Sequence, residues 1–105
     1  MTRKASGIVR ITVQSDARDA VTLKVEGMVS GANVTELQRA WRDLGPSLES
    51  RRLVLDLRGV TYLDVSGTQV LGEIYSKTGA EFLVESPLTK YFMEQVQQDV
   101  RNHLK

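Results

Sequence analysis

The stretch Leu-Val-Leu-Asp-Leu at residues 53–57 limits the possible folds most strongly, because it is almost continuously apolar and rich in branched side chains. A run of this kind is typical of a strand that is covered on both faces. A helix is expected at 66–78, with Ser66 as its N-cap and Gln69 completing a capping box. Residues 80–85 then return as a second buried strand. Strand, helix and strand with short connections predict a parallel βαβ unit.

Two alternating segments precede this unit. Residues 8–14 and 20–26 each place every second side chain on an apolar face, and a short polar loop joins them, so they predict an antiparallel hairpin. A helix follows, and Pro46, which has no amide hydrogen, is expected to end or kink it. Ser86 and Pro87 form the start of a last helix. Apolar stripes are expected at Val34, Leu37, Trp41, Leu44 and Leu48 in the first helix and at Leu88, Phe92, Val96, Val100 and Leu104 in the last.

The predicted order of elements is therefore β-β-α-β-α-β-α. This order describes an α/β fold in which three helices pack on a mixed, four-stranded sheet. The length of 105 residues suits one domain over residues 1–105. In the connection after residue 57, we expect Val60, Tyr62 and Leu63 to point inward.

Composition excludes several classes of protein. Hydrophobic residues make up 41% and charged residues 26% of the chain, as in globular proteins. The net charge of +1 argues against a nucleic-acid-binding protein. No apolar run approaches the roughly 20 residues that span a bilayer, so we expect no membrane insertion and a cytoplasmic location. The absence of cysteine excludes disulfides and thiolate chemistry.

The chain offers little for catalysis. His103 is the only histidine and lies near the C-terminus, so the usual catalytic triads cannot form. Asp56 and Asp64 are explained more simply by bonds to nearby amides and by stabilisation of a helix N-terminus. The glycines form neither of the common nucleotide-binding fingerprints. We therefore expect no enzyme activity, no metal and no cofactor.

Residues 53–75, LVLDLRGVTYLDVSGTQVLGEIY, resemble the signature of the STAS domain family, the fold of anti-sigma factor antagonists. That signature has an apolar strand ending in Asp-Leu, a short connection, a hydrophobic residue with Asp-Ser-Ser-Gly, and a helix. Asp56-Leu57 and the segment from Leu63 to Gly67 fit this frame. The hairpin, the βαβ unit and the last helix also follow the order of the family.

The resemblance implies a protein-binding module in bacterial signalling by partner switching. Its relatives bind a histidine-kinase-like anti-sigma factor and so release a sigma factor for transcription. Phosphorylation of the first Ser of Asp-Ser-Ser-Gly switches them off, but this position is Val65 here. Ser66 matches the second Ser. Ser66 and Thr68 are possible phosphorylation sites that the resemblance itself does not support.

Our hypothesis is that the loop at 61–65 and the first turn of the following helix form a docking surface for a protein partner. Val65 adds apolar contact area at its centre, Asp64 shapes the turn, Ser66 caps the helix, and Gly67 lets another backbone approach closely. We expect a monomer or weak dimer. The residues of this surface are Tyr62, Asp64, Val65, Ser66, Gly67 and Thr68.

Two other functions stay open. The chain could be a STAS subunit of another assembly, such as a lipid-transport ATPase or a stress-signalling complex, because a permanently unphosphorylated Val65 suits a structural subunit. A small nucleotide-binding protein is the alternative from another class. Titration with ATP or GTP, followed by the fluorescence of Trp41, would test it.

Overall fold

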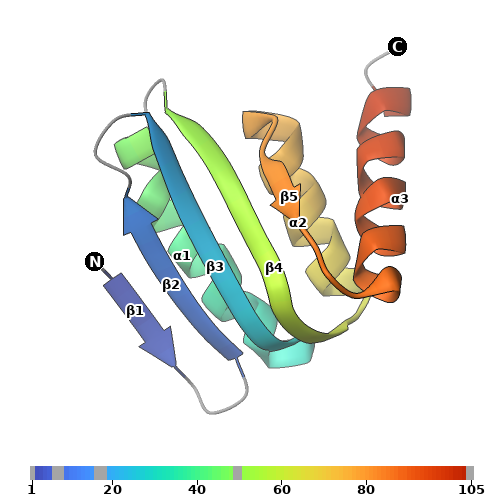
Figure 1. Ribbon diagram of the computed structural model, residues 1–105, viewed down its shortest axis with the longest axis horizontal. Helices are drawn as coiled ribbons and strands as arrows, with labels where there is room; N and C mark the ends of the chain where they lie inside the picture. The colour runs from blue at the N-terminus through green and yellow to red at the C-terminus, as the bar shows by residue number, and fades with distance from the viewer. Residues whose placement is uncertain (1, 6–8, 16–18, 49–50, 104–105) are drawn as a thin grey trace.

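A mixed five-stranded sheet, with strands in the order β1-β2-β3-β4-β5, carries two helices on one face, and the last helix lies at one edge (Figure 1). The computed structural model describes residues 2–5, 9–15, 19–48 and 51–103. The elements are β1 (Thr2–Ala5), β2 (Val9–Ser15), β3 (Ala20–Val29), the short 3-10 helix η1 (Gly31–Asn33), α1 (Val34–Leu48), β4 (Arg52–Leu63), α2 (Val65–Thr78), β5 (Glu81–Leu83) and α3 (Pro87–His103).

The predicted order β-β-α-β-α-β-α is confirmed. Strands β2 and β3 form the antiparallel hairpin, and β4, α2 and β5 form the parallel βαβ unit. Strands β3 and β4 are also parallel, so α1 completes a second βαβ unit. A fifth strand, β1, adds to the four that the sequence predicts and pairs antiparallel with β2 at the edge of the sheet.

The core lies between the sheet and the helices α1 and α2. Leu23 of β3, Leu55 of β4 and Leu71 of α2 are completely buried. Burial of each such side chain stabilises the folded protein by about 1.5–3 kcal/mol, because its apolar surface is removed from water. The ring of Tyr75 on α2 packs against that of Phe82 on β5, with their centroids 5.5 Å apart, and this contact joins α2 to the edge of the sheet.

Of the two outcomes predicted at Pro46, an end or a kink, the end does not occur, because α1 continues to Leu48. Pro46 lies in the last turn, where its missing amide removes one helical hydrogen bond, the one to the carbonyl four residues earlier. Leu44 and Leu48 are both buried on the side of this turn that faces the core. The burial of these two side chains offsets the cost of the proline.

The strand β4 is longer than predicted, because the expected connection after residue 57 belongs to it as far as Leu63. Val60 and Leu63 are buried as expected, but Tyr62 is wrongly predicted to point inward, since 53% of its surface is exposed. Strand β5, in contrast, is a three-residue edge strand that is only half-buried, because nothing pairs with its outer side among the described residues.

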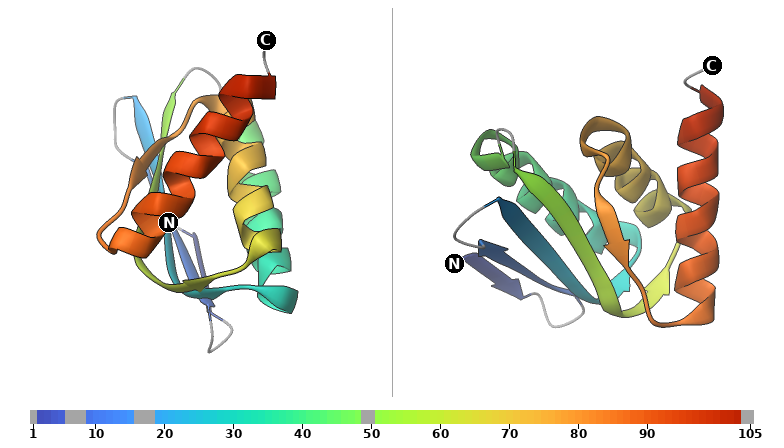
Figure 2. Two further views of the ribbon diagram at one scale, coloured as in Figure 1. Left: turned by 90° about the vertical axis from the view of Figure 1, so that its right-hand side faces the viewer. Right: turned by 45° about the horizontal axis from the view of Figure 1, so that its top comes forward.

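The helix α3 begins as predicted, with Pro87 as its first residue and Ser86 Oγ accepting a hydrogen bond from the amide of Leu88 at 3.2 Å. The helix lies beside α2 at the β5 edge of the sheet (Figure 2). Leu88 is 62% exposed, which contradicts its place in the predicted stripe, whereas Thr89, Met93 and Val96 are buried. The face that carries Thr89, Met93 and Val96 is buried because α3 packs against α2 and β4. The side chain of Val100 and all of Leu104 lie outside the described residues.

Candidate protein-docking site

The carboxylate of Asp64 starts helix α2. Its Oδ1 accepts hydrogen bonds from the amide of Gly67 and from Ser66 Oγ, both at 2.8 Å. Asp64 is therefore the N-cap, and α2 begins at Val65. The prediction that Ser66 caps the helix is wrong, because Asp64 already occupies the extended position from which a side chain can reach the third helical amide.

The same carboxylate also holds the segment that leads into α1. Its Oδ2 accepts a hydrogen bond from the amide of Gly31, the first residue of η1, at 3.0 Å. Gly31 has a positive φ of 54°, which glycine adopts without strain. One side chain thus joins the starts of two helices, a larger role than the turn-shaping one that the sequence predicts.

These donors stabilise the charged form of Asp64 and lower its pKa, with the amide of Gly67 contributing most and that of Gly31 next. The pKa of Asp56 is also lowered, chiefly by the side chain of Arg58, whose Nε lies 2.9 Å from Asp56 Oδ1. Both carboxyls therefore stay ionised at neutral pH. Asp56 alternates along β4 with the core residues Leu55 and Leu57, so its side chain lies on the face of the sheet opposite to α1 and α2.

We expect Asp64→Ala to lower the midpoint of thermal unfolding by several degrees at neutral pH, because it removes the cap and the bond to Gly31. The pKa of this carboxyl is lower in the folded than in the unfolded chain. Its stabilising effect is therefore present above about pH 4 and is lost as the pH falls through the lowered pKa. The difference in stability between wild type and variant should shrink on acidification.

Thermal unfolding followed by circular dichroism over a series of pH values measures this difference. Asp64→Asn is the matched control, since asparagine keeps a capping acceptor without the charge. A difference that stays constant down to strongly acidic pH would contradict the role of the carboxylate.

Gly67 is buried, and the backbone that comes close to it belongs to β3 of the same chain, not to a partner as the docking hypothesis has it. A methyl group at Gly67 would overlap the carbonyl oxygen of Val29 at the end of β3, and it would lie 3.0 Å from the side chains of both Val29 and Leu63. The absence of a side chain at Gly67 therefore lets α2 pack closely on β3. Gly67 is not accessible to a partner.

Apolar side chains surround the start of α2 on the surface. Val65 is 73% and Tyr62 53% exposed, and Leu88 of α3 lies nearby, beside a hollow that Tyr62 also lines. Single exposed apolar residues are common, but adjacent ones at the mouth of a groove are typical of interaction sites. Val65 therefore has the exposure that a docking surface needs.

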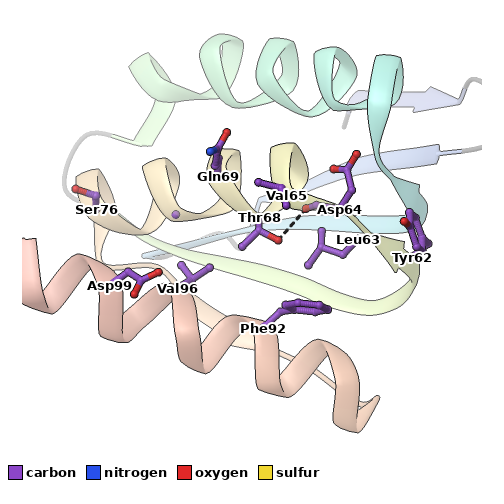
Figure 3. A pocket seen from close by; sticks show the side chains of 11 residues that line it. Tyr62, Leu63, Asp64, Val65, Thr68, Gln69, Ser76, Phe92, Val96 and Asp99 are labelled. Carbon is purple, nitrogen blue, oxygen red and sulfur yellow. Dashed lines mark hydrogen bonds between the residues drawn. The ribbon is translucent and has the colours of Figure 1, made fainter.

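A groove of about 810 Å³ runs between α2 and α3 from this point (Figure 3). Figure 3 shows Val65 and Thr68 on one wall and Phe92 and Val96 on the other, with Tyr62 at one end and Asp99 toward the other. The residues that line the groove are Tyr62, Leu63, Asp64, Val65, Thr68, Gln69, Gly72, Ser76, Phe92, Val96 and Asp99.

Comparison with known proteins identifies the family and the fold of this chain. Residues 12–103 match the family model described as "Mlab, STAS domain". The chain belongs to the STAS domain family. No curated protein matches it.

Solved structures share the STAS fold. The crystal structure of an anti-sigma factor antagonist from Mycobacterium paratuberculosis is similar with a TM-score of 0.72 and 23% identity, over 90% of this chain and 83% of that one. The STAS domain of an anti-sigma factor antagonist from Rhodobacter sphaeroides has a TM-score of 0.56 and 23% identity, over 76% and 88% of the two chains. At this identity the likeness shows the fold.

The STAS motif residues meet at the start of α2, though only some of them face the groove. Tyr62, Asp64, Val65 and Thr68 line it, whereas Ser66 and the buried Gly67 do not. The hydroxyl of Ser66 donates to Asp64 Oδ1, and that of Thr68 donates to the carbonyl of Asp64 at 2.9 Å.

The sequence-based reasoning missed the far half of the groove, which Gly72, Ser76, Phe92, Val96 and Asp99 line. The spacing of Gly72 and Ser76 from Thr68 places them on one face of α2, and this signal is visible in the sequence. The position of α3 beside this face is not visible there.

Among the described residues, no group of three or more histidine, cysteine, aspartate or glutamate side chains could hold a metal ion. Within the same residues, each helix is too short or too polar to cross a bilayer. The side chain of His103 lies outside the described part of the chain.

Proposed function

We propose that this STAS protein is a non-enzymatic binding module that binds a kinase-type anti-sigma factor and so regulates sigma-dependent transcription in the cytoplasm. The exposure of Val65 at the first residue of α2 carries the proposal. This is the position at which the resemblance places the regulatory serine of the relatives. The proposed docking surface consists of Tyr62, Val65, Ser66 and Thr68. Asp64 and the buried Gly67 do not belong to the contact itself but fix the backbone beneath it.

We expect Val65→Asp to abolish measurable binding to such an anti-sigma factor. The change imitates the missing phosphate by placing a negative charge in an apolar contact, where it would lose its water without gaining a cation. Binding is measured by isothermal titration calorimetry with purified candidate anti-sigma factors.

The control is Gln38→Asp, which adds the same charge at an exposed position on α1. Circular dichroism verifies that both variants fold. Unchanged affinity of folded Val65→Asp would show that the docking surface lies elsewhere.

A second candidate is a STAS subunit of another assembly, such as a lipid-transport ATPase or a stress-signalling complex. Two observations favour it: Val65 has no hydroxyl to phosphorylate, and the matching family model carries Mlab in its description. Purification of native complexes discriminates the two candidates. A histidine-kinase-like partner supports the anti-sigma factor antagonist, and a transporter ATPase supports the second candidate.

A further inference from the structure

We infer that α3 is a hinged helix, which opens away from α2 and the edge of the sheet while the sheet, α1 and α2 stay folded. The structure shows the closed form. This movement is independent of the proposed function, since it involves no partner. Three features of the molecule point to it: the attachment of α3, the surface of α2 that faces it, and the bonds that begin each of the two helices.

The attachment of α3 to the rest of the domain is narrow. Residues 84–86, which belong to no strand or helix, connect it to β5, and β5 is itself a three-residue strand at the edge of the sheet. Among the described side chains of α3, the buried ones are Thr89, Met93 and Val96. They follow each other at intervals of about one helical turn and so form a single stripe, with a polar residue at its start.

The side of α2 that faces α3 is suited to contact with water. The residues of α2 that line the groove between the two helices are Val65, Thr68, Gln69, Gly72 and Ser76. All except Val65 are small or polar, and Val65 is exposed already in the closed form. The large apolar side chains of α2 belong instead to the core: Val70, Leu71 and Ile74. Loss of α3 therefore uncovers less apolar surface on α2 than loss of the sheet would.

The hydrogen bonds that begin α3 are local. Ser86 Oγ accepts a hydrogen bond from the amide of Leu88 at 3.2 Å, and the carbonyl of Ser86 accepts one from the amide of Lys90 at 2.9 Å. Both bonds can move with the helix. The start of α2, in contrast, is bonded through the Asp64 carboxylate to the distant amide of Gly31. The first turn of α2 is thus tied to another segment, whereas the first turn of α3 is complete in itself.

Opening of α3 changes the surroundings of Tyr62. A hollow of about 240 Å³ lies beside this ring, between the end of β4 and the start of α3. The residues that line it are Val60, Thr61, Tyr62 and Leu63 of β4, with Ser86, Leu88, Thr89 and Phe92 at the start of α3. In the open form the hollow loses one wall. A ligand that contacts both sides of it would therefore favour the closed form.

Amide hydrogen exchange of the folded wild-type protein, followed by NMR, measures the opening. A single helix of 17 residues is at most marginally stable in water, so its amides exchange once it is detached. We expect the amides of residues 92–98 in α3 to be protected at least about tenfold less than those of Leu55 in β4 and Leu71 in α2. They should share one opening constant, because the helix detaches as a unit. Equal protection of the three elements overturns the inference, and so does protection that falls steadily toward the C-terminus, as in a fraying helix.

A disulfide across the groove provides a locked form. The chain has no cysteine, so Gly72→Cys combined with Val96→Cys introduces a single pair. A carbon atom added at Gly72 would lie 3.6 Å from Val96 Cγ1, which brings cysteines at these two positions close enough to form a disulfide. In the reduced protein, α3 should again be less protected than β4. Oxidation should close this difference, because α3 then detaches only when the whole domain unfolds.

The reduced form is the matched control for the locked form, since the two differ only in the disulfide. Circular dichroism verifies that both are folded, and intact mass spectrometry verifies that the bond has formed. A difference in protection between α3 and β4 that persists after oxidation overturns the inference, because exchange in α3 would then not require its separation from α2. If the double variant does not fold, the exchange pattern of the wild type decides between the outcomes given above.

Discussion

Gly67→Ala is expected to destabilise the folded protein by about 1–3 kcal/mol or more, the range observed when a methyl group is forced into a packed site. The new methyl group would overlap the carbonyl oxygen of Val29. A flexible side chain could turn away from such a contact, but a backbone carbonyl at the end of β3 cannot. Relief would require α2 to move away from the sheet, which would also loosen the cap at Asp64.

Gly72→Ala, five residues further along the same helix, is the matched control. Its methyl group would reach only ordinary van der Waals contact with Val96. Alanine is the better helix former by about 1 kcal/mol, so we expect this variant to be more stable than the wild type. Urea unfolding of the three proteins measures both effects. Equal stability of Gly67→Ala and Gly72→Ala would contradict the close packing of α2 on β3.

Val65→Ser is expected to accept a phosphate at the first residue of α2, where the wild type has no hydroxyl. The resemblance places the phosphorylated serine of the relatives at this position, which lies exposed at the first residue of α2. A phosphate is favourable there because the helix dipole and the free amides of the first turn attract negative charge. Incubation with ATP and a candidate kinase-type anti-sigma factor should add about 80 Da, one phosphate carrying up to about two negative charges.

We expect the wild type to stay unmodified in the same reaction. Its nearest hydroxyls, on Ser66 and Thr68, already donate hydrogen bonds to Asp64, and a phosphate on Ser66 would stand beside that carboxylate. Intact mass spectrometry reads both outcomes, and Val65→Ala is the control without a hydroxyl. A phosphate on the wild type would contradict this expectation, and if peptide mapping places it on Ser66 or Thr68 it would restore the ordinary switch.

Local sequence signals predict much of the fold. The hairpin and the βαβ unit follow from alternating and continuous apolar runs, and Ser86 with Pro87 marks the start of α3 through bonds within one turn. Features that depend on distant contacts are not predictable in this way. Helix α1 passes Pro46 because Leu48 finds a place in the core, and β1 is a strand because β2 offers it an edge.

The same distinction holds for the candidate site. The motif places Asp64, Val65 and Gly67 together, because they are neighbours in sequence. Their roles depend on remote partners, since Gly31 completes the bonds of Asp64 and Val29 fills the space at Gly67. The groove itself exists only once α3 has packed beside α2, so no local pattern could reveal it.

The bond between Asp64 and Gly31 spans 33 positions of the chain and has a practical consequence. The amide proton of Gly31 belongs to the approach to α1, yet its exchange with deuterium reports on the state of the α2 start. A ligand that displaces the Asp64 side chain would break this bond and speed the exchange of the Gly31 amide. A ligand that stabilises the bond would slow the exchange. Exchange of the Gly31 amide, followed by NMR, therefore reports whether a ligand is bound at the start of α2. The partner and the surface that it covers need no label.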